Sequence, residues 1–213
     1  MNKRNYSKEM DNVITQLESK APTLLLHSCC APCSSACLEQ LCQFFKVTVF
    51  YYNPNITDED EYNKRVLEQK RFIDAVNKQG GIRKELCKPF NEIQFIEGRY
   101  QKEEFFNIAK GYEKCPEGGE RCFRCYELRL REAAVVALSG GYDFFTTTLT
   151  ISPLKNAEKL NEIGEKIALE KGVKFLPSDF KKKNGYKRSI ELSKEFELYR
   201  QNFCGCVYSK VSG

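Results

Sequence analysis

Residues 23–37 read TLLLHSCCAPCSSAC and pass from an apolar run directly into a turn that is crowded with cysteines. The three leucines at 24–26 are typical of a strand that is buried on both faces, as the strands of parallel sheets are. We expect this strand to end near His27 and a helix to follow over 34–45. Pro32 suits the first turn of that helix. The turn is therefore predicted to lie at the strand end where open α/β sheets bind ligands.

Along the rest of the chain, strand patterns alternate with helix patterns. Further strands are predicted at 47–52, 82–87, 142–149 and 173–176, and further helices at 58–78, 122–138, 156–170 and 190–199. This alternation predicts an α/β fold in which a doubly wound parallel sheet is flanked by helices.

The chain has 213 residues, of which 41% are hydrophobic, so that it can bury one full core. We therefore expect a single domain over 1–213. Within it, residues 1–20 are predicted to form a helical N-terminal extension. Residues 98–121 are predicted to form an irregular excursion that leads into a cysteine-bearing helix.

The formal charge of +5 is mildly basic, short of the charge typical of a dedicated nucleic-acid binder. The polar N-terminal region lacks the apolar segment of a signal peptide, and the leucine run is too short to span a membrane. We expect a cytoplasmic protein with no membrane partner. Its thiols would then be metal ligands, redox groups or core residues rather than a secreted disulfide framework.

Seven of the eleven cysteines form three close groups, which are Cys29-Cys30-x-x-Cys33, Cys122-x-x-Cys125 and Cys204-x-Cys206. Thiolates a few residues apart can bind one metal centre, and two such pairs supply four ligands. A structural zinc site would use the same number of ligands. The adjacency of Cys29 and Cys30 is unusual for zinc and fits an iron–sulfur cluster better.

The remaining candidates have weaker signals. Cys204 and Cys206 could form a redox pair, add further metal ligands or belong to a tail without a role. His27, the only histidine, is interpreted either as structural or as a proton donor beside the cysteine turn. The basic run KKKNGYKR at 181–188 is either a solvated face or, if the fold brings it near Arg121, Arg124, Arg129 and Arg131, a phosphate-binding surface. Three other cysteines are expected in the core, namely Cys37, Cys42 and Cys87, while Cys115 is left open.

Five motifs follow one another along the chain, namely LLLHSCCAPC, YYNPNI, RCFRCYELRL, TTTLTISPLKN and FCGC. In order and content they resemble the QueH-type epoxyqueuosine reductases over about residues 22–208. The resemblance implies a Rossmann-like fold of the HUP type, related to adenine-nucleotide hydrolases, with a 4Fe-4S cluster and without cobalamin. It also implies reduction of epoxyqueuosine to queuosine in the wobble position of tRNA, with an electron donor that the sequence does not identify.

The resemblance also assigns roles to residues. The implied cluster ligands are Cys29, Cys30, Cys122 and Cys125, and the implied redox-active pair is Cys204 and Cys206. Cys33 is assigned to the substrate or to an additional iron. Because the cysteines stand where nucleotide-binding relatives have a glycine-rich phosphate loop, we do not expect ATP use.

Reductive removal of an epoxide oxygen consumes two electrons and two protons and leaves an alkene and water. An iron–sulfur cluster supplies electrons one at a time, and an acid or a metal must activate the oxygen. The candidate acids are His27, Tyr52 and a carboxylate. A flipped base would stack on aromatic side chains, for which Tyr51, Tyr52 and Tyr126 are candidates.

Two other interpretations compete. A sulfur-transfer tRNA enzyme on the same fold would need a glycine-containing phosphate loop, and SCCAPCSS has no glycine. A zinc-stabilised RNA-binding module without catalysis would be colourless, whereas a cluster protein is brown.

Overall fold

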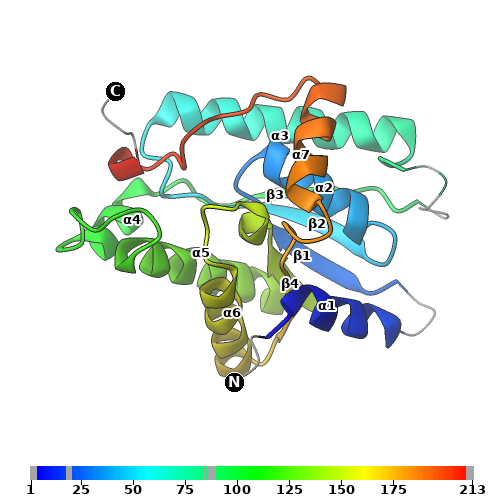
Figure 1. Cartoon of the computed structure of the whole chain (residues 1–213), viewed down its shortest axis with the longest axis horizontal. Helices are drawn as coiled ribbons and strands as arrows, with labels where there is room; N and C mark the ends of the chain where they lie inside the picture. Colours follow the sequence, from blue (N-terminus) through cyan, green and yellow to red (C-terminus); the bar gives the residue numbers. More distant parts are fainter. Residues whose placement is uncertain (1–3, 18–20, 84, 86–89, 210–213) are drawn as a thin grey trace.

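The computed structural model of the chain describes residues 4–17, 21–83, 85 and 90–209. Within these residues, parallel strands form one five-stranded sheet in the order β3-β2-β1-β4-β5. The strands are β1 (Thr23–His27), β2 (Lys46–Tyr51), β3 (Gln94–Glu97), β4 (Phe144–Thr147) and β5 (Lys174–Phe175). The α/β fold expected from the sequence is confirmed, with helices on both faces of the sheet (Figure 1).

The α-helices are α1 (Tyr6–Thr15), α2 (Ala31–Leu41), α3 (Glu59–Gln79), α4 (Lys102–Ala109), α5 (Glu120–Ser139), α6 (Ala157–Lys171) and α7 (Gly185–Glu195). Two short 3₁₀ helices are η1 (Thr148–Ile151) and η2 (Val207–Ser209). Side chains cap the helix starts where the sequence favours them: Asp58 accepts a hydrogen bond from the backbone of α3, and Asn156 accepts one from the backbone of α6. Gly80 and Gly172 end these two helices in the left-handed conformation that glycine permits.

The unbroken leucine run of β1 is explained by burial on both sides of the sheet. Leu24 and Leu26 belong to a core that also contains residues of α1, α2, α3 and α7. Leu25 belongs to the opposite core, which is built mainly from α5 and α6. In Figure 1 the sheet accordingly lies between α3 on one side and α5 on the other.

Several element bounds differ from the sequence expectation. Helix α2 begins at Ala31 rather than at residue 34, because Cys30 already occupies the cap position and Pro32 lies in the first turn. Strand β4 is shorter than expected, because residues 148–151 close into η1 after Thr147 accepts a hydrogen bond from the backbone of Leu149. Helix α7 begins at Gly185, so the basic run leads into its first turn.

The third strand is also placed differently. The strand predicted over 82–87 falls largely outside the described residues, and the third strand of the sheet is β3, which pairs with β2. Residues 94–97, QFIE, give little strand signal, because β3 is a four-residue edge strand whose side chains are half-buried or exposed.

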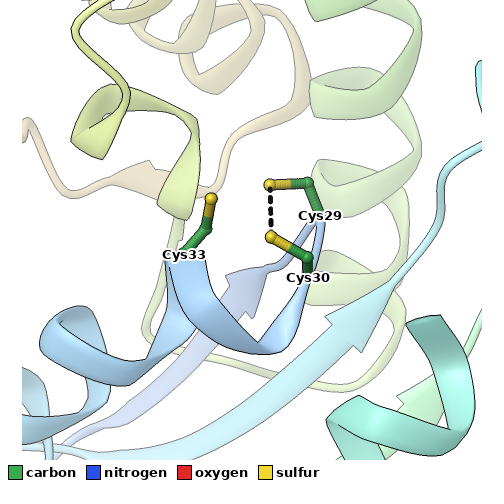
Figure 2. A group of neighbouring side chains, drawn as sticks. All are labelled: Cys29, Cys30 and Cys33. Carbon is green, nitrogen blue, oxygen red and sulfur yellow. Dashed lines mark hydrogen bonds between the residues drawn. The ribbon is translucent and has the colours of Figure 1, made fainter. Parts of the chain in front are cut away.

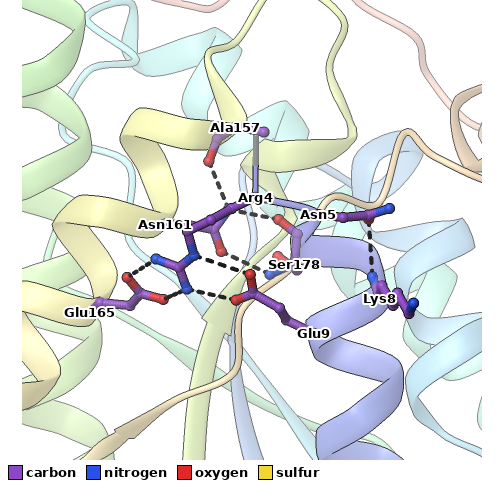
Figure 3. A network of polar contacts seen from close by, with 8 residues as sticks. All are labelled: Arg4, Asn5, Lys8, Glu9, Ala157, Asn161, Glu165 and Ser178. Carbon is purple, nitrogen blue, oxygen red and sulfur yellow. Dashed lines mark hydrogen bonds and ion pairs between the residues drawn. The ribbon is translucent and has the colours of Figure 1, made fainter. Parts of the chain in front are cut away.

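The two peripheral segments pack against the rest of the chain. In the N-terminal extension, Met10 of α1 is buried in the first core, and Arg4 forms ion pairs with Glu9 and with Glu165 of α6 (Figure 3). The excursion over 98–121 is irregular only in part, since it contains α4. No described helix has the length and apolar character needed to cross a membrane. The single domain stays a prediction.

Candidate functional site

The cysteine turn lies at the point where the sheet changes its winding direction. After β1 the chain enters α2 on one face, whereas after β4 it continues to α6 on the other face. A crevice forms outside the carboxyl ends of strands at such a point. The turn is joined to the end of β2, because Ser28 N–H donates to Phe50 O at 2.9 Å and the Asn53 amide donates to Ser28 O at 2.8 Å.

Three thiols of the turn converge on one point. The sulfur atoms of Cys29, Cys30 and Cys33 all lie within 4.8 Å of one another. Cys29 and Cys30 extend from the loop after β1 and Cys33 from the first turn of α2, and their sulfurs face a common space (Figure 2). Cys29 Sγ and Cys30 Sγ are 3.9 Å apart. Thiols held this closely are suited to share one metal centre.

A buried glutamine of α3 holds the cysteine turn in place. The Ser28 hydroxyl donates to Gln69 Oε1 at 2.8 Å, and Gln69 Nε2 donates to Ser34 Oγ at 3.0 Å. Gln69 is fully buried although α3 is rich in charge. Its residue type does not mark it as a site residue, but its position three residues after the buried Val66 and three before the buried Phe72 places it on the apolar face of α3.

A second group of thiols lies around the start of α5. Gly118 N–H donates to Cys122 Sγ at 3.3 Å, and the buried Cys125 packs in one cluster with Cys206. A small chamber of about 20 Å³ is lined by both of these cysteines together with Cys122 and Cys204. Among the described residues, no thiol of this second group belongs to the compact group of Cys29, Cys30 and Cys33.

A larger cavity of about 310 Å³ adjoins this chamber. Cys29, Cys33 and Cys204 lie in its wall, and the loop between η1 and α6 forms another part of that wall. The two spaces share four lining residues, which are Glu117, Arg129, Lys155 and Cys204. The volume is at the lower end of the range for small-molecule sites, about 300–1,000 Å³. The thiol groups that are distant in the sequence therefore border one continuous region.

Arg129 places a buried positive charge in this region, which favours the binding of a negatively charged group. The side chain is 1% exposed, and its two terminal nitrogens have no hydrogen-bond partner among the described atoms. Burial lowers the pKa of the guanidinium, but the thiols of Cys125, Cys204 and Cys29 raise it above its ordinary value. A buried cation without an anion is unfavourable. A metal centre ligated by thiolates would supply the missing negative charge, so the residues present fit such a group.

The three thiols of the turn differ in their acidity. Hydrogen bonds from Cys30 and then Cys33 hold the pKa of Cys29 well below its ordinary value. The same interactions with Cys29 raise the pKa of Cys30 to about 12 and the pKa of Cys33 well above its ordinary value. Cys29 is therefore the group that ionises first, and metal binding by the others must release their protons.

His27 and Tyr52 are both engaged within the protein. His27 is fully buried, and its Nε2 lies 3.0 Å from Tyr52 O, which can only accept, so Nε2 carries the proton. Its Nδ1 accepts from the Thr147 hydroxyl at 2.9 Å. Burial lowers the pKa of His27 to about 4. The Tyr52 hydroxyl donates to Glu104, and neither residue lines either cavity. This geometry favours the structural interpretation of His27.

The aromatic side chains that line the larger cavity are not the ones expected from the sequence. Tyr51, Tyr52 and Tyr126 are buried, and of the three only Tyr126 borders the small chamber. The aromatic side chains in the wall of the larger cavity are Tyr186 and Phe203. The sequence contained a signal for these two, since Tyr186 interrupts the basic run and Phe203 begins FCGC.

The basic run is largely paired with acids. Lys181, Lys183 and Arg188 form ion pairs with Asp179, Asp11 and Glu39, respectively. Of the arginines that the sequence suggested as partners of this run, Arg121 and Arg129 are buried, Arg124 pairs with Glu120, and Arg131 pairs with Glu127 and Glu170. The expectation that these arginines join the run in one phosphate-binding surface is therefore not supported.

The FCGC segment is held against the N-terminal part of α3 and the loop before it. Arg65 Nη1 donates to Cys204 O at 3.2 Å, and Thr57 N–H donates to Gly205 O at 3.2 Å. Cys204 and Cys206 are free thiols, so a disulfide between them stays a prediction.

The other cysteines lie away from both cavities or outside the described part of the chain. Cys37 and Cys42 are buried in the first core, as predicted. Cys115 is half-buried and lines neither cavity. Cys87 lies outside the described residues.

Fold and site together define an α/β protein with a cysteine-rich centre at the switch point of a parallel sheet. Residues 24–212 match the family described as "Epoxyqueuosine reductase QueH", and the chain belongs to this family. It is 41% identical over 214 residues to the epoxyqueuosine reductase QueH of Streptococcus pyogenes, an alignment that covers 99% of this chain and 80% of that protein. The protein of the same name from Staphylococcus epidermidis is 41% identical, with 98% and 86% covered. That of Thermotoga maritima is 36% identical, with 88% and 90% covered.

Proposed function

We propose that this chain reduces epoxyqueuosine to queuosine. The observation that carries the proposal is the compact group of Cys29, Cys30 and Cys33 in a chain that belongs to the QueH family, with two of these thiols in the wall of a ligand-sized cavity. In the overall reaction, two electrons and two protons are consumed. Both carbon–oxygen bonds of the epoxide break, a carbon–carbon double bond forms, and the oxygen leaves as water.

The proposed cofactor is a 4Fe-4S cluster held by Cys29, Cys30, Cys122 and Cys125. When bound, such a cluster supplies electrons one at a time. The buried Arg129 would balance the negative charge of its thiolates, and the Gly118 N–H that donates to Cys122 Sγ would stabilise that ligand. Cys33 then remains for an additional iron or for contact with the substrate. The Cys204 and Cys206 pair is proposed to be redox-active, because both thiols border the same chamber.

The proposed substrate is a tRNA that carries epoxyqueuosine in the wobble position. The larger cavity would receive the flipped nucleoside, with Tyr186 and Phe203 available for stacking and Leu149 and Ile151 excluding water. The electron donor would be a one-electron carrier, and a reducing cytoplasm would keep the thiols available for metal.

Metal analysis tests the proposed cofactor. Anaerobically purified wild type should contain about four irons and four acid-labile sulfides per chain. Cys122→Ser should lose most of both, whereas Cys115→Ser should retain them, because Cys115 lines neither cavity. Zinc without sulfide in reconstituted wild type would contradict the cofactor and the redox chemistry with it.

An activity assay tests the reaction itself. Wild type with a strong one-electron reductant should convert epoxyqueuosine in tRNA to queuosine, which nucleoside mass spectrometry detects as the loss of one oxygen atom. Protein with a complete metal centre that leaves the epoxide intact would overturn the proposed function.

A further inference from the structure

A hydrogen-bond donor beside the reducing centre would assist the reaction, and the described donors are not equally available. The epoxide oxygen gains negative charge as its first carbon–oxygen bond breaks, so a positive donor at that oxygen lowers the barrier. His27 has both ring nitrogens occupied by hydrogen bonds, and the Tyr52 hydroxyl is bound to Glu104. Neither of these two side chains is therefore available to the substrate.

Lys155 lies where the larger cavity meets the small chamber. It lines both spaces. The other residues that line both are Cys204, Glu117 and Arg129. Glu117 carries a carboxylate, which accepts rather than donates. The two terminal nitrogens of Arg129 have no hydrogen-bond partner among the described residues, but the side chain is only 1% exposed, so a substrate in the cavity has little access to it. Lys155 is half-buried and lines the cavity whose wall also contains Cys29 and Cys33.

The ammonium group of Lys155 has no partner among the described residues. It forms neither a hydrogen bond nor an ion pair there, whereas Lys159 and Lys166 of α6 both pair with carboxylates. Burial lowers the pKa of Lys155, but the sulfurs of Cys204, Cys29 and Cys33 raise it above its ordinary value, so the side chain stays protonated. A charged donor near three thiols and without a fixed partner can bind an incoming oxygen.

The backbone that carries Lys155 is fixed on both sides. The Lys155 N–H donates to Ser152 O at 3.3 Å, and the Leu154 N–H donates to the Ser152 hydroxyl at 3.3 Å. The next residue, Asn156, caps α6 by accepting from Lys159 N–H at 3.0 Å. The short loop between η1 and α6 therefore holds the side chain at the cavity wall.

We propose that Lys155 is a catalytic residue that donates a hydrogen bond to the epoxide oxygen of the substrate and stabilises the charge that develops there. The proposal rests on the proposed function. It adds no step to the reaction balance: the two electrons come from a one-electron donor, and the oxygen leaves as water with two protons.

Three variants test it. Lys155→Met removes the donor and keeps the length of the side chain, Lys155→Arg restores a positive donor, and Lys166→Met is a matched control on exposed α6 surface away from both cavities. We expect kcat of Lys155→Met to fall about 100- to 1,000-fold, with KM changed far less. Lys155→Arg should recover part of this loss, and Lys166→Met should behave as wild type.

A binding measurement without turnover separates a substrate contact from a structural role. In oxidised protein, wild type should bind tRNA with epoxyqueuosine more tightly than tRNA with queuosine, and Lys155→Met should lose this preference while it keeps its iron and sulfide. A Lys155→Met protein that retains kcat, retains the preference or loses its iron would overturn the proposal. Wild type that fails to convert the epoxide would instead overturn the proposed function, and the role of Lys155 with it.

Discussion

Arg129 is a buried cation whose charge balance depends on the metal centre that the cysteines would bind. Its guanidinium is buried, two of its nitrogens have no hydrogen-bond partner in the described part of the chain, and the titratable groups around it include the thiols of Cys29, Cys125 and Cys204. Positive charge next to a metal–thiolate centre favours the more negative, reduced state. Arg129 should therefore raise the reduction potential of the centre.

Replacing Arg129 tests this electrostatic role. Arg129→Met should lower the reduction potential of the reconstituted centre and reduce the iron that it retains, because the thiolate charge loses its counterion. Arg129→Lys keeps a cation and should shift the potential less. Spectroelectrochemical titration together with iron and sulfide analysis measures both effects. Equal potentials and equal iron contents in wild type and Arg129→Met would contradict the role.

Asp143 joins β1 to β4 at the amino ends of these strands, opposite the cysteine turn. The backbone N–H and the hydroxyl of Thr23 both donate to Asp143 Oδ2 at 2.8 Å. The backbone hydrogen bond first, and then the hydroxyl, hold the pKa of Asp143 below its ordinary value. The folded protein thus binds this proton more weakly than the unfolded chain. The stability that results is present above the unfolded pKa of about 3.9 and is lost as pH falls through the folded pKa.

Asp143→Ala should accordingly lower the free energy of unfolding by about 1 kcal/mol at neutral pH, since the carboxylate is exposed and its hydrogen bonds are partly screened. The difference from wild type should shrink below about pH 4. Urea unfolding at both pH values measures it. Asp74→Ala, which removes an exposed carboxylate of α3 that has no hydrogen bond in the described structure, should show no such pH-dependent difference. A constant difference between Asp143→Ala and wild type would refute the linkage.

At the scale of elements, the FCGC segment depends on α3 and the loop that precedes it. Arg65 of α3 donates to the carbonyl oxygens of Phe203 and Cys204, at 3.4 Å and 3.2 Å. Gly205 has φ of +106°, and a Cβ there would lie 2.8 Å from Ile56 Cγ1. Only glycine fits both the backbone conformation and the space. The position of Cys204 and Cys206 at the chamber therefore depends on this close approach.

Gly205→Ala should release the segment. The clash and the unfavourable backbone conformation together should cost about 1–3 kcal/mol of docking free energy, so Cys204 and Cys206 should react faster with iodoacetamide. Mass spectrometry of digested, time-sampled protein measures the two rates. Gly111→Ala is the matched control, because Gly111 has φ of +82° with no neighbouring atom within 4 Å. Unchanged reaction rates in Gly205→Ala would contradict the expected release.

At the scale of the whole molecule, the cysteine centre collects segments from three distant parts of the chain. The turn after β1, the first turn of α5 and the segment after α7 all border the two adjoining cavities. A metal centre with ligands from more than one of these segments would tie them together in the folded state only. Metal binding should therefore stabilise the fold.

Metal removal tests this linkage. The iron-loaded protein should be roughly 3–4 kcal/mol more stable than the metal-free form, which corresponds to a rise in melting temperature of about 2–4 °C for each kcal/mol. Anaerobic differential scanning calorimetry of both forms measures the shift. It should largely disappear in Cys122→Ser and persist in Cys115→Ser. Identical melting temperatures of the loaded and metal-free wild type would show that the metal does not join the segments.

Local sequence was sufficient to predict much of the fold and the location of the cysteine turn. Leu24 to Leu26 are buried on both sides of the sheet, Pro32 lies in the first turn of α2, and helices α3 and α6 begin within a residue of the positions predicted for them. These features depend on burial periodicity and on contacts within a few residues, which the sequence shows directly. Strand β3 was not predicted, because its place in the sheet depends on pairing with β2.

The roles available to individual side chains were decided by tertiary structure. Adjacency in sequence made His27 a candidate acid, but burial and two hydrogen bonds engage it within the core. Gln69, Arg129 and Lys155 reach the centre from three different parts of the chain, and no local pattern marks them as neighbours. Sequence alone therefore determined the α/β architecture, the family and the cysteine groups. Which charges and donors face the cavity was decided only when distant segments folded together at the carboxyl ends of the strands. Such contacts join residues that are remote along the chain, so no local pattern shows them.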